Sequence, residues 1–321
     1  MRRAFRLAAM AVALWVAACG GSAPPPPKSG STIPMTPAEA RAYLSEVQVQ
    51  RGLPLPQHAP VTSMDELVAI ISTDNVSRFG DAVEFVQGKP GIDAITLHAA
   101  IELAWSDSYS TVAALAEEFG KRAKIEEDRL KKQRDEGKVF TNSETRTLEQ
   151  ASAEAATLDR TKRALRVLAD DHLRAASVPV GECLRQFERD PKSFRVAAFY
   201  YLLAADWPSF DKAMSRYEHY EGDAGIQYLR ALESLKRYGV RKDARDQLDD
   251  ALRIDPRMVR AQAKLVLIED GIDEMNAELQ KLREMNPTHL IVGIAGPSIK
   301  REYDFSTSLS RAKAAQSTPP K

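Results

Sequence analysis

A serine and a lysine three residues apart form the first pattern in this chain that could do chemistry. Ser209 and Lys212 stand in the order Ser-x-x-Lys, in which a lysine amine can take the proton of a serine nucleophile. The motifs that accompany this chemistry, Ser-Asp-Asn and Lys-Thr-Gly, do not follow. Pro208 and Ser209 are also residues that commonly begin a helix. The sequence therefore predicts a helix start here and no serine catalysis.

The histidines and one internal cysteine offer no metal site. None of the histidines stands in His-Glu-x-x-His or at a paired ligand spacing. His98 and Glu102 are expected to form an i,i+4 pair at the surface. Cys183 lies in an apolar stretch and is predicted to be a small buried side chain. We expect no cofactor and no metal.

A glutamate followed by a serine is the last candidate for catalysis. Glu233-Ser234 resembles the catalytic Glu-Ser of lytic transglycosylases, some of which contain helical solenoids. The Gly-Leu-Met-Gln that follows in that family is absent here. We therefore predict a protein that is not an enzyme. The alternative is a cell-wall (peptidoglycan) enzyme or enzyme activator with a divergent site.

The N-terminal residues carry the most specific pattern. Three arginines precede an apolar run, Leu7 to Ala18, of about 12 residues, against roughly 20 needed to cross a bilayer. The order Val-Ala-Ala-Cys that ends at Cys19 resembles the lipobox of bacterial lipoproteins. The resemblance implies that residues 1–18 are a signal peptide and that Cys19 is lipidated, with a palmitate-type acyl anchor. An ordinary secretory peptide that is cut nearby is the alternative.

Charge and composition exclude one class of partner. The chain has 321 residues with 45 basic and 45 acidic side chains. Removal of residues 1–18 takes away three arginines and leaves 42 basic and 45 acidic residues. A nearly neutral chain has no electrostatic footprint for nucleic acid. The hydrophobic content of 44% is that of a globular protein.

The first part of the mature chain reads as a tether followed by helices. Residues 19–35 are rich in glycine and proline, which predicts a disordered tether. Thr36 and Glu39 form a capping box around Pro37 and begin the first helix. Apolar residues then recur at helical spacings, with a break at 106–108, and no alternating strand pattern is found. We predict an all-α fold with an N-terminal helical region over 36–108.

Residues 109–175 show the pattern of a long helical hairpin. The stretch from Lys121 to Lys138 is almost wholly charged, with acids and bases interleaved, which is typical of a solvated helix face. Thr141 and Glu144 form a second capping box. Apolar residues follow them at near-heptad spacing. The pattern predicts a long antiparallel coiled-coil hairpin whose tip lies roughly 40 Å from the body.

Residues 176–304 contain the clearest internal repeat. Ala244, Leu248, Ala251 and Pro256 stand at offsets of 0, 4, 7 and 12 and resemble the second half of a tetratricopeptide repeat. The same offsets recur with larger residues from Met275 onward. The resemblance implies stacked helical hairpins, a tetratricopeptide-like α-solenoid. Residues 305–321 are expected to be a disordered tail.

The repeat resemblance also implies a partner-binding face. In tetratricopeptide proteins, ligands lie against the first helix of each repeat on its concave side. The matching positions here are Ile226, Leu229, Glu233, Lys236 and Arg237. The alternative is that the two apolar residues pack against the next hairpin while the three charged residues are solvated.

The hairpin tip is the second predicted contact. Val139 and Phe140 are adjacent apolar residues at a protruding end, where little core is available to bury them. Such a pair suggests a contact point for a partner. The alternative is a local cluster with Leu130 or Leu148 that tightens the turn.

Together these patterns predict a non-catalytic scaffold in the bacterial cell envelope. Lipid anchor and helical repeats resemble tetratricopeptide-type lipoproteins that act as pilotins or assembly factors for outer-membrane machines. Gly20 after the cysteine implies the periplasmic face of the outer membrane, since an aspartate there retains lipoproteins in the inner membrane. The expected partners are the membrane, through the lipid, and unidentified envelope proteins. A surface-displayed structural lipoprotein is a further alternative.

Overall fold

The computed structural model describes residues 34–53, 55, 59–218 and 223–317, and side chains through Ser308. The chain divides into two units, Met1–Pro34 and Met35–Lys321, and the elements below belong to the second. Cys19, the signal peptide and nearly all of the predicted tether lie outside the described residues. Within the described ranges every element is a helix, which confirms the all-α prediction.

The first helix begins as the sequence predicts. In α2 (Pro37–Gln50), the Thr36 hydroxyl accepts the Glu39 amide at 3.3 Å, and the Glu39 carboxylate accepts the Thr36 amide at 2.8 Å. This reciprocal capping satisfies two amides that the helix leaves free. Three short elements follow and lead to the long helices: α3 (Met64–Ser72), η1 (Val76–Arg78) and α4 (Phe79–Val86).

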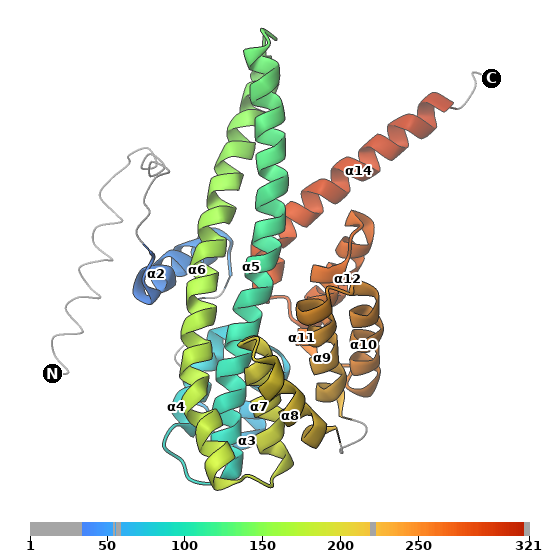
Figure 1. The fold of residues 1–321 in the computed structure, drawn as a ribbon. Helices are drawn as coiled ribbons and strands as arrows, with labels where there is room; N and C mark the ends of the chain where they lie inside the picture. Colours follow the sequence, from blue (N-terminus) through green and yellow to red (C-terminus); the bar gives the residue numbers. More distant parts are fainter. Residues whose placement is uncertain (1–33, 54, 56–58, 219–222, 318–321) are drawn as a thin grey trace, which may run out of the picture. The chain divides into compact units, whose positions relative to one another are not determined.

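Two long helices dominate the unit and confirm the predicted hairpin. Figure 1 shows α5 (Ile92–Asp135) and α6 (Asn142–Gln186) running side by side in opposite directions. At 1.5 Å per residue, the 44 residues of α5 span about 66 Å. Gly137 adopts a φ of 88° in the connecting turn, and the predicted capping box of Thr141 and Glu144 begins α6.

Both helices extend beyond the predicted limits of the hairpin. The break expected at 106–108 is absent, because α5 passes through these residues without interruption. The boundary placed at 175/176 likewise falls inside α6. The polar side chains in this stretch have tertiary partners: Asp107 and Ser108 are buried and bond to other parts of the chain. Tertiary partners replace the turn that these residue types usually indicate.

Three helical hairpins follow α6 in tandem. Their first helices begin at residues 191, 224 and 259, which are 33 and 35 residues apart. Ala244, Leu248 and Ala251, the repeat signature of the second hairpin, are fully buried. The elements are α7 (Pro191–Leu203), α8 (Trp207–Tyr217), α9 (Ala224–Glu233) with its last turn η2 (Ser234–Tyr238), α10 (Arg241–Ile254), α11 (Val259–Ile268) and α12 (Ile272–Met285).

The C-terminal segment departs from expectation. A short helix, α13 (Leu290–Ile294), leads to α14 (Gly296–Ser317), which packs against α12. The predicted disordered tail from residue 305 is therefore wrong as far as Ser317. Residues 311–315 are alanine, lysine and arginine, which favour helix, and Lys300 pairs with Asp304 one turn later at 2.9 Å.

The described core consists of two groups of buried apolar side chains that meet at α5. Leu115 and Phe119 belong to the group formed with α2, α4, α6 and α12, whereas Ala99 and Leu103 belong to the group formed with the first two hairpins and α11. A helix that is buried on several sides must satisfy its polar side chains within the protein. The polar residues of α5 are therefore the place to look for a functional site.

Candidate functional site

An ion pair is buried where the first helices of the hairpins meet α5. Lys264 of α11 places its ammonium 2.8 Å from the Asp107 carboxylate and also bonds to the Thr111 hydroxyl. The Tyr228 hydroxyl of α9 donates to the second oxygen of Asp107. Asp107 is fully buried, and Lys264 and Tyr228 are 4% and 3% exposed. One carboxylate of α5 thus holds two consecutive hairpins.

The surroundings lower the pKa of Asp107 and raise the pKa of Tyr228. Burial by itself would raise the pKa of Asp107, but Lys264 and Tyr228 hold it below its ordinary value. Burial and the nearby carboxylate raise the pKa of Tyr228 well above its ordinary value. Asp107 is therefore a carboxylate and Tyr228 a neutral phenol over the physiological range.

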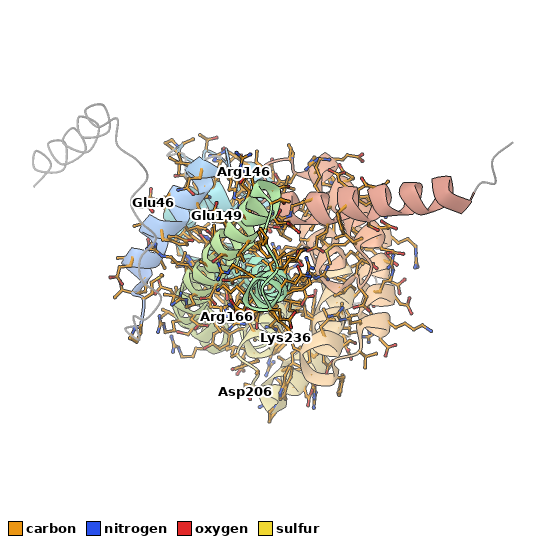
Figure 2. The ribbon with its side chains drawn as sticks, turned by 90° about the horizontal axis from the view of Figure 1, so that it is seen from above. Glu46, Arg146, Glu149, Arg166, Asp206 and Lys236 are labelled. Carbon is orange, nitrogen blue, oxygen red and sulfur yellow. The ribbon has the colours of Figure 1, made fainter. Side chains whose placement is uncertain are left out.

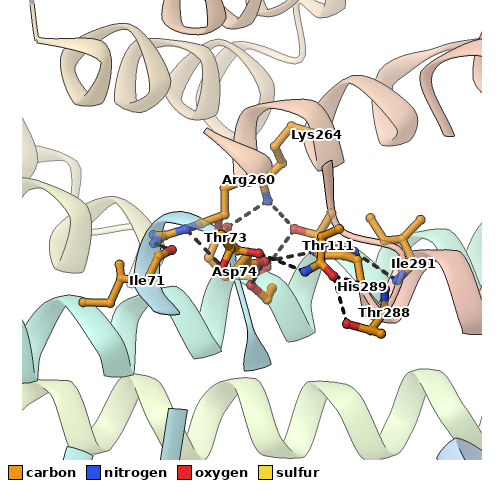
Figure 3. A network of polar contacts seen from close by, with 12 residues as sticks. Ile71, Thr73, Asp74, Thr111, Arg260, Lys264, Thr288, His289 and Ile291 are labelled. Carbon is orange, nitrogen blue, oxygen red and sulfur yellow. Dashed lines mark hydrogen bonds and ion pairs between the residues drawn. The ribbon is translucent and has the colours of Figure 1, made fainter. Parts of the chain in front are cut away.

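A second buried carboxylate lies beside the first. Asp74, in the turn after α3, accepts hydrogen bonds from the Ser108 hydroxyl at 2.6 Å and from His289 Nε2 at 3.0 Å (Figure 3). Its other oxygen faces the Arg260 Nε at 3.6 Å. Arg260 also donates to the Ile71 carbonyl at 3.1 Å. We call the eight side chains of these two clusters the buried network: Asp74, Asp107, Ser108, Thr111, Tyr228, Arg260, Lys264 and His289.

The hydrogen bonds of His289 determine its tautomer. The Nδ1 atom accepts the backbone N–H of Ile291 at 3.2 Å and therefore carries no proton. The proton lies on Nε2, which donates to Asp74. Both ring nitrogens are thus occupied, and neither is available to a substrate.

A serine, a histidine and an aspartate meet in the buried network, but their bonds differ from those of a catalytic triad. In a triad the serine donates to the histidine, which in turn donates to the aspartate. Here Ser108 donates directly to Asp74, and His289 does so independently. Ser108 therefore has no base, and the cluster is arranged to join α5 to the segments around Asp74 and His289.

The predicted partner-binding face on α9 is only partly exposed. Ile226 and Leu229 are 5% and 2% exposed and belong to the core group that includes Ala99 and Leu103 of α5. Their burial agrees with the first half of the alternative, in which the two apolar residues pack inside the protein. The physical reason is that α5 already lies against the first helices of the hairpins, where Tyr228 and Lys264 reach it.

The charged residues of the same face have partners within the chain. Arg237 bonds to Asp211 of α8 at 2.7 Å and to Glu233 at 2.9 Å. Its guanidinium lies 5.4 Å from the centre of the Trp207 ring, a cation–π distance. These contacts tie the second hairpin to the first, so Glu233 and Arg237 are not simply solvated. Lys236 is exposed and lies near the long helices (Figure 2).

The tip of the hairpin agrees with its predicted exposure. Val139 is 90% exposed, the highest value among the exposed large apolar side chains. Phe140 is half-buried, with the Lys138 ammonium 5.8 Å from the centre of its ring. Leu130 and Leu148 are buried at 3% and 8%, so Val139 does not share their cluster.

From Lys124 to the tip, the described side chains of the hairpin form hydrogen bonds and ion pairs only with each other. Within the described part of the chain, the side-chain hydrogen bonds and ion pairs of residues 124–150 stay inside α5, α6 and their turn. Seen end-on in Figure 2, charged side chains such as Arg146 and Glu149 point outward from it. We call residues 124–150 the shaft, whose end protrudes from the other helices in Figure 1, and the exposed Val139 lies at this end.

Two further expectations can be compared with the structure. Cys183 is fully buried, as predicted, and burial raises the pKa of its thiol to about 11. The expected i,i+4 pair of His98 and Glu102 is present, with His98 Nε2 3.9 Å from Glu102 Oε1, but Glu102 is buried and not at the surface. Its carboxylate lies 2.7 Å from His172 Nδ1, and the His172 ring stacks on Trp105 with centroids 3.9 Å apart.

Sequence reasoning did not single out the residues of the buried network. Asp107 was assigned to a break between helices, Tyr228 was considered only as a position of the repeat, and Asp74 and Lys264 were not considered. One signal was available: Lys264 stands inside the apolar run of α11, and a lysine there must find an anionic partner if the helix is buried. The identity of that partner could not be read from the sequence.

Comparison with known proteins does not assign the chain to a family. No protein family, no curated protein and no solved structure matches this chain. Among the residues that the structure describes, no helix has both the length and the apolar character required to cross a bilayer. The same residues contain no group of three or more histidine, cysteine or acidic side chains placed to hold a metal.

Proposed function

We propose that this protein is a lipid-anchored scaffold or assembly factor of the bacterial periplasm, without catalytic activity, that binds other envelope proteins through the α5–α6 hairpin. The observation that carries the proposal is the exposed Val139 at the end of residues 124–150, whose side-chain hydrogen bonds and ion pairs with the described residues stay within the hairpin. Solvent exposure of a large apolar residue at such a position is a feature of contact sites. The anchor would be Cys19 and the location the periplasmic face of the outer membrane.

The tandem hairpins support the same proposal in a different way. Their spacing of 33 and 35 residues and the buried repeat signature agree with a tetratricopeptide-like solenoid. Because α5 lies against their first helices, we assign them the role of a base that holds the shaft. Tyr228 and Lys264 provide the attachment through Asp107. Partner binding then belongs to the tip and not to the inner face of the hairpins.

Site-specific crosslinking in cells tests the contact at the tip. A photoreactive amino acid at Val139 should give a discrete crosslinked protein, whereas one at Val178 should not. Val178 is the matched control, because it is a valine of α6 that is 69% exposed but lies near the other end of the hairpin. The double variant Val139→Ser with Phe140→Ser should lose partner capture without a change in melting temperature, since Val139 buries almost nothing. Equal crosslinking at both valines would contradict the proposal.

Anchoring is tested separately. Mass analysis of the native protein should show an acylated amino terminus at Cys19. The variant Cys19→Ala should leave the membrane fraction. An intact, unmodified Cys19 would rule out the anchor, and protease access on intact cells would instead indicate display at the cell surface.

A further inference from the structure

A cavity of about 310 Å³ opens beside the buried network. It lies where α3, α5, α7, the start of α9 and the segment before α11 come together, so five distant parts of the chain line it. Its walls are largely apolar, and its volume is in the range of small-molecule sites. The apolar walls are formed by Val68, Ile71, Leu97, Phe199, Leu229 and Met258.

Four charged side chains also line this cavity. They are Arg195, Asp223, Asp255 and Arg260. Arg260 is already engaged, because it donates to the Ile71 carbonyl and faces Asp74 of the buried network. The other three form no ion pair within 4 Å with any described residue. The cavity is therefore lined by both acidic and basic side chains that do not pair with one another.

The hydrogen bonds of the two acids leave them free to bind a cation. Asp255 accepts the Arg257 amide through one oxygen at 3.1 Å, and no donor of the described residues bonds to its other oxygen. Asp223 accepts the Gly225 amide at 2.7 Å and the Tyr217 hydroxyl, and each carboxylate oxygen can accept more than one hydrogen bond. Arg195 interacts with the neutral Tyr217 hydroxyl, and its exposed side chain forms no ion pair with an acid of the described residues.

We propose that this cavity binds a small apolar zwitterion, either an apolar amino acid or a short apolar peptide. Its ammonium meets Asp255, with Asp223 nearby, its carboxylate meets Arg195, and its apolar side chains fill the space between Leu97, Phe199 and Met258. Such a ligand supplies both missing charges and buries apolar surface at once. This site is independent of the tip contact proposed above, because it lies on other elements and needs no partner protein.

Calorimetry on the purified full chain, free of detergent, tests the proposal with matched probes. Leucyl-phenylalanine should bind, while its N-acetylated form and its C-terminal amide should each bind about tenfold more weakly or worse, because each lacks one charge-assisted hydrogen bond. Octanoate, an apolar anion without an ammonium group, should bind no better than the acetylated peptide. Equal affinity for the free and either capped form, or no binding of the free form at millimolar concentration, overturns the proposal.

Three variants locate the site. Asp255→Asn and Arg195→Gln should each weaken leucyl-phenylalanine about tenfold, and Ala100→Leu, which fills the cavity from α5, should abolish binding. Asp206→Asn is the control, since Asp206 caps α8 outside the cavity and asparagine caps equally well. If the melting temperature of Ala100→Leu is lowered, its loss of binding is disregarded, and the affinities of Asp255→Asn and Arg195→Gln decide the test. Unchanged affinity in both Asp255→Asn and Arg195→Gln would place the ligand elsewhere and overturn the proposal.

Discussion

The middle of α5 and its part near the tip of the hairpin carry charged residues in opposite ways. Near its middle, Asp107 is fully buried and bonds to residues 121 and 157 positions away along the chain. Toward the tip, the exposed side chains of Lys124 and Asp128 form an ion pair at 3.0 Å, one turn apart on the same helix. The first arrangement joins distant elements, whereas the second supports a helix that has few neighbours.

The comparison shows what each kind of charge contributes. Exposed pairs at i,i+3 and i,i+4 stabilise a helix by a few tenths of a kcal/mol each and are screened by salt. A buried pair adds little net stability, but loss of one partner is costly because the other charge remains buried. The shaft should therefore tolerate single charge changes, while the base of the hairpin should not.

The largest effect is expected at the buried ion pair. Lys264→Met leaves the Asp107 carboxylate buried without a cation and should lower the free energy of unfolding by about 3–5 kcal/mol. Urea unfolding followed by circular dichroism measures this loss. The double variant Lys264→Met with Asp107→Asn should recover a large part of it, because no uncompensated charge remains. Strictly additive effects of the two substitutions would show that the pair does not act as a unit.

A smaller and local effect is expected in the shaft. Leu130→Ala removes a side chain that is 3% exposed and should cost about 2 kcal/mol. Hydrogen exchange should increase between residues 124 and 150 and stay unchanged around Asp107, because the shaft bonds only to itself. Ile125→Ala is the control, since Ile125 is 69% exposed on the same helix. Increased exchange throughout α11 would contradict the separation of the two regions.

The pH dependence of Glu127 sharpens the comparison further. Hydrogen bonding to Lys131 lowers the pKa of Glu127 from about 4.5 to about 2. Because the folded-state pKa is depressed, the stabilisation is complete above the ordinary value near 4.5 and is lost as the pH falls toward 2. The difference in melting temperature between the wild type and Glu127→Gln should therefore shrink between pH 5 and pH 2. A difference that is independent of pH would refute this assignment.

Glu269, among the hairpins, should show the opposite and smallest trend. Burial raises its pKa, and Glu278 adds to the rise while Arg245 opposes it. A raised folded-state pKa makes the folded protein lose stability as the pH rises through the ordinary value near 4.5. The wild type should thus lose stability relative to Glu269→Gln as the pH rises from 4 to 7. The reverse trend in melting temperature would mean that the pair with Arg245 outweighs burial.

Local patterns predicted the elements well where the evidence lay within a few residues. The capping boxes at Thr36 and Thr141 begin α2 and α6 as expected, because both partners of each box are three residues apart. The burial of Ala244, Leu248 and Ala251 also follows from helical spacing, which places them on one face. The exposure of Val139 follows from its place in a turn between charged helices.

Predictions failed where the outcome depended on what a segment packs against. The residues 106–108 have turn-forming types, yet the helix continues because Asp74, Tyr228 and Lys264 satisfy their side chains. Ile226 and Leu229 were expected on a groove, but both are buried in the core group that includes Ala99 and Leu103 of α5. The cavity lined by five segments had no sequence signature at all, because its walls come from residues 68 to 260.

The sequence by itself determined the helical class, the long charged hairpin, the tandem spacing and the bare tip, since each of these rests on hydrogen bonds and periodicity along a single segment. Only the tertiary structure decided which charges are buried together and which faces remain open. Desolvation makes a buried carboxylate such as Asp107 depend on a cation and a hydroxyl from other helices, and no local pattern encodes that pairing.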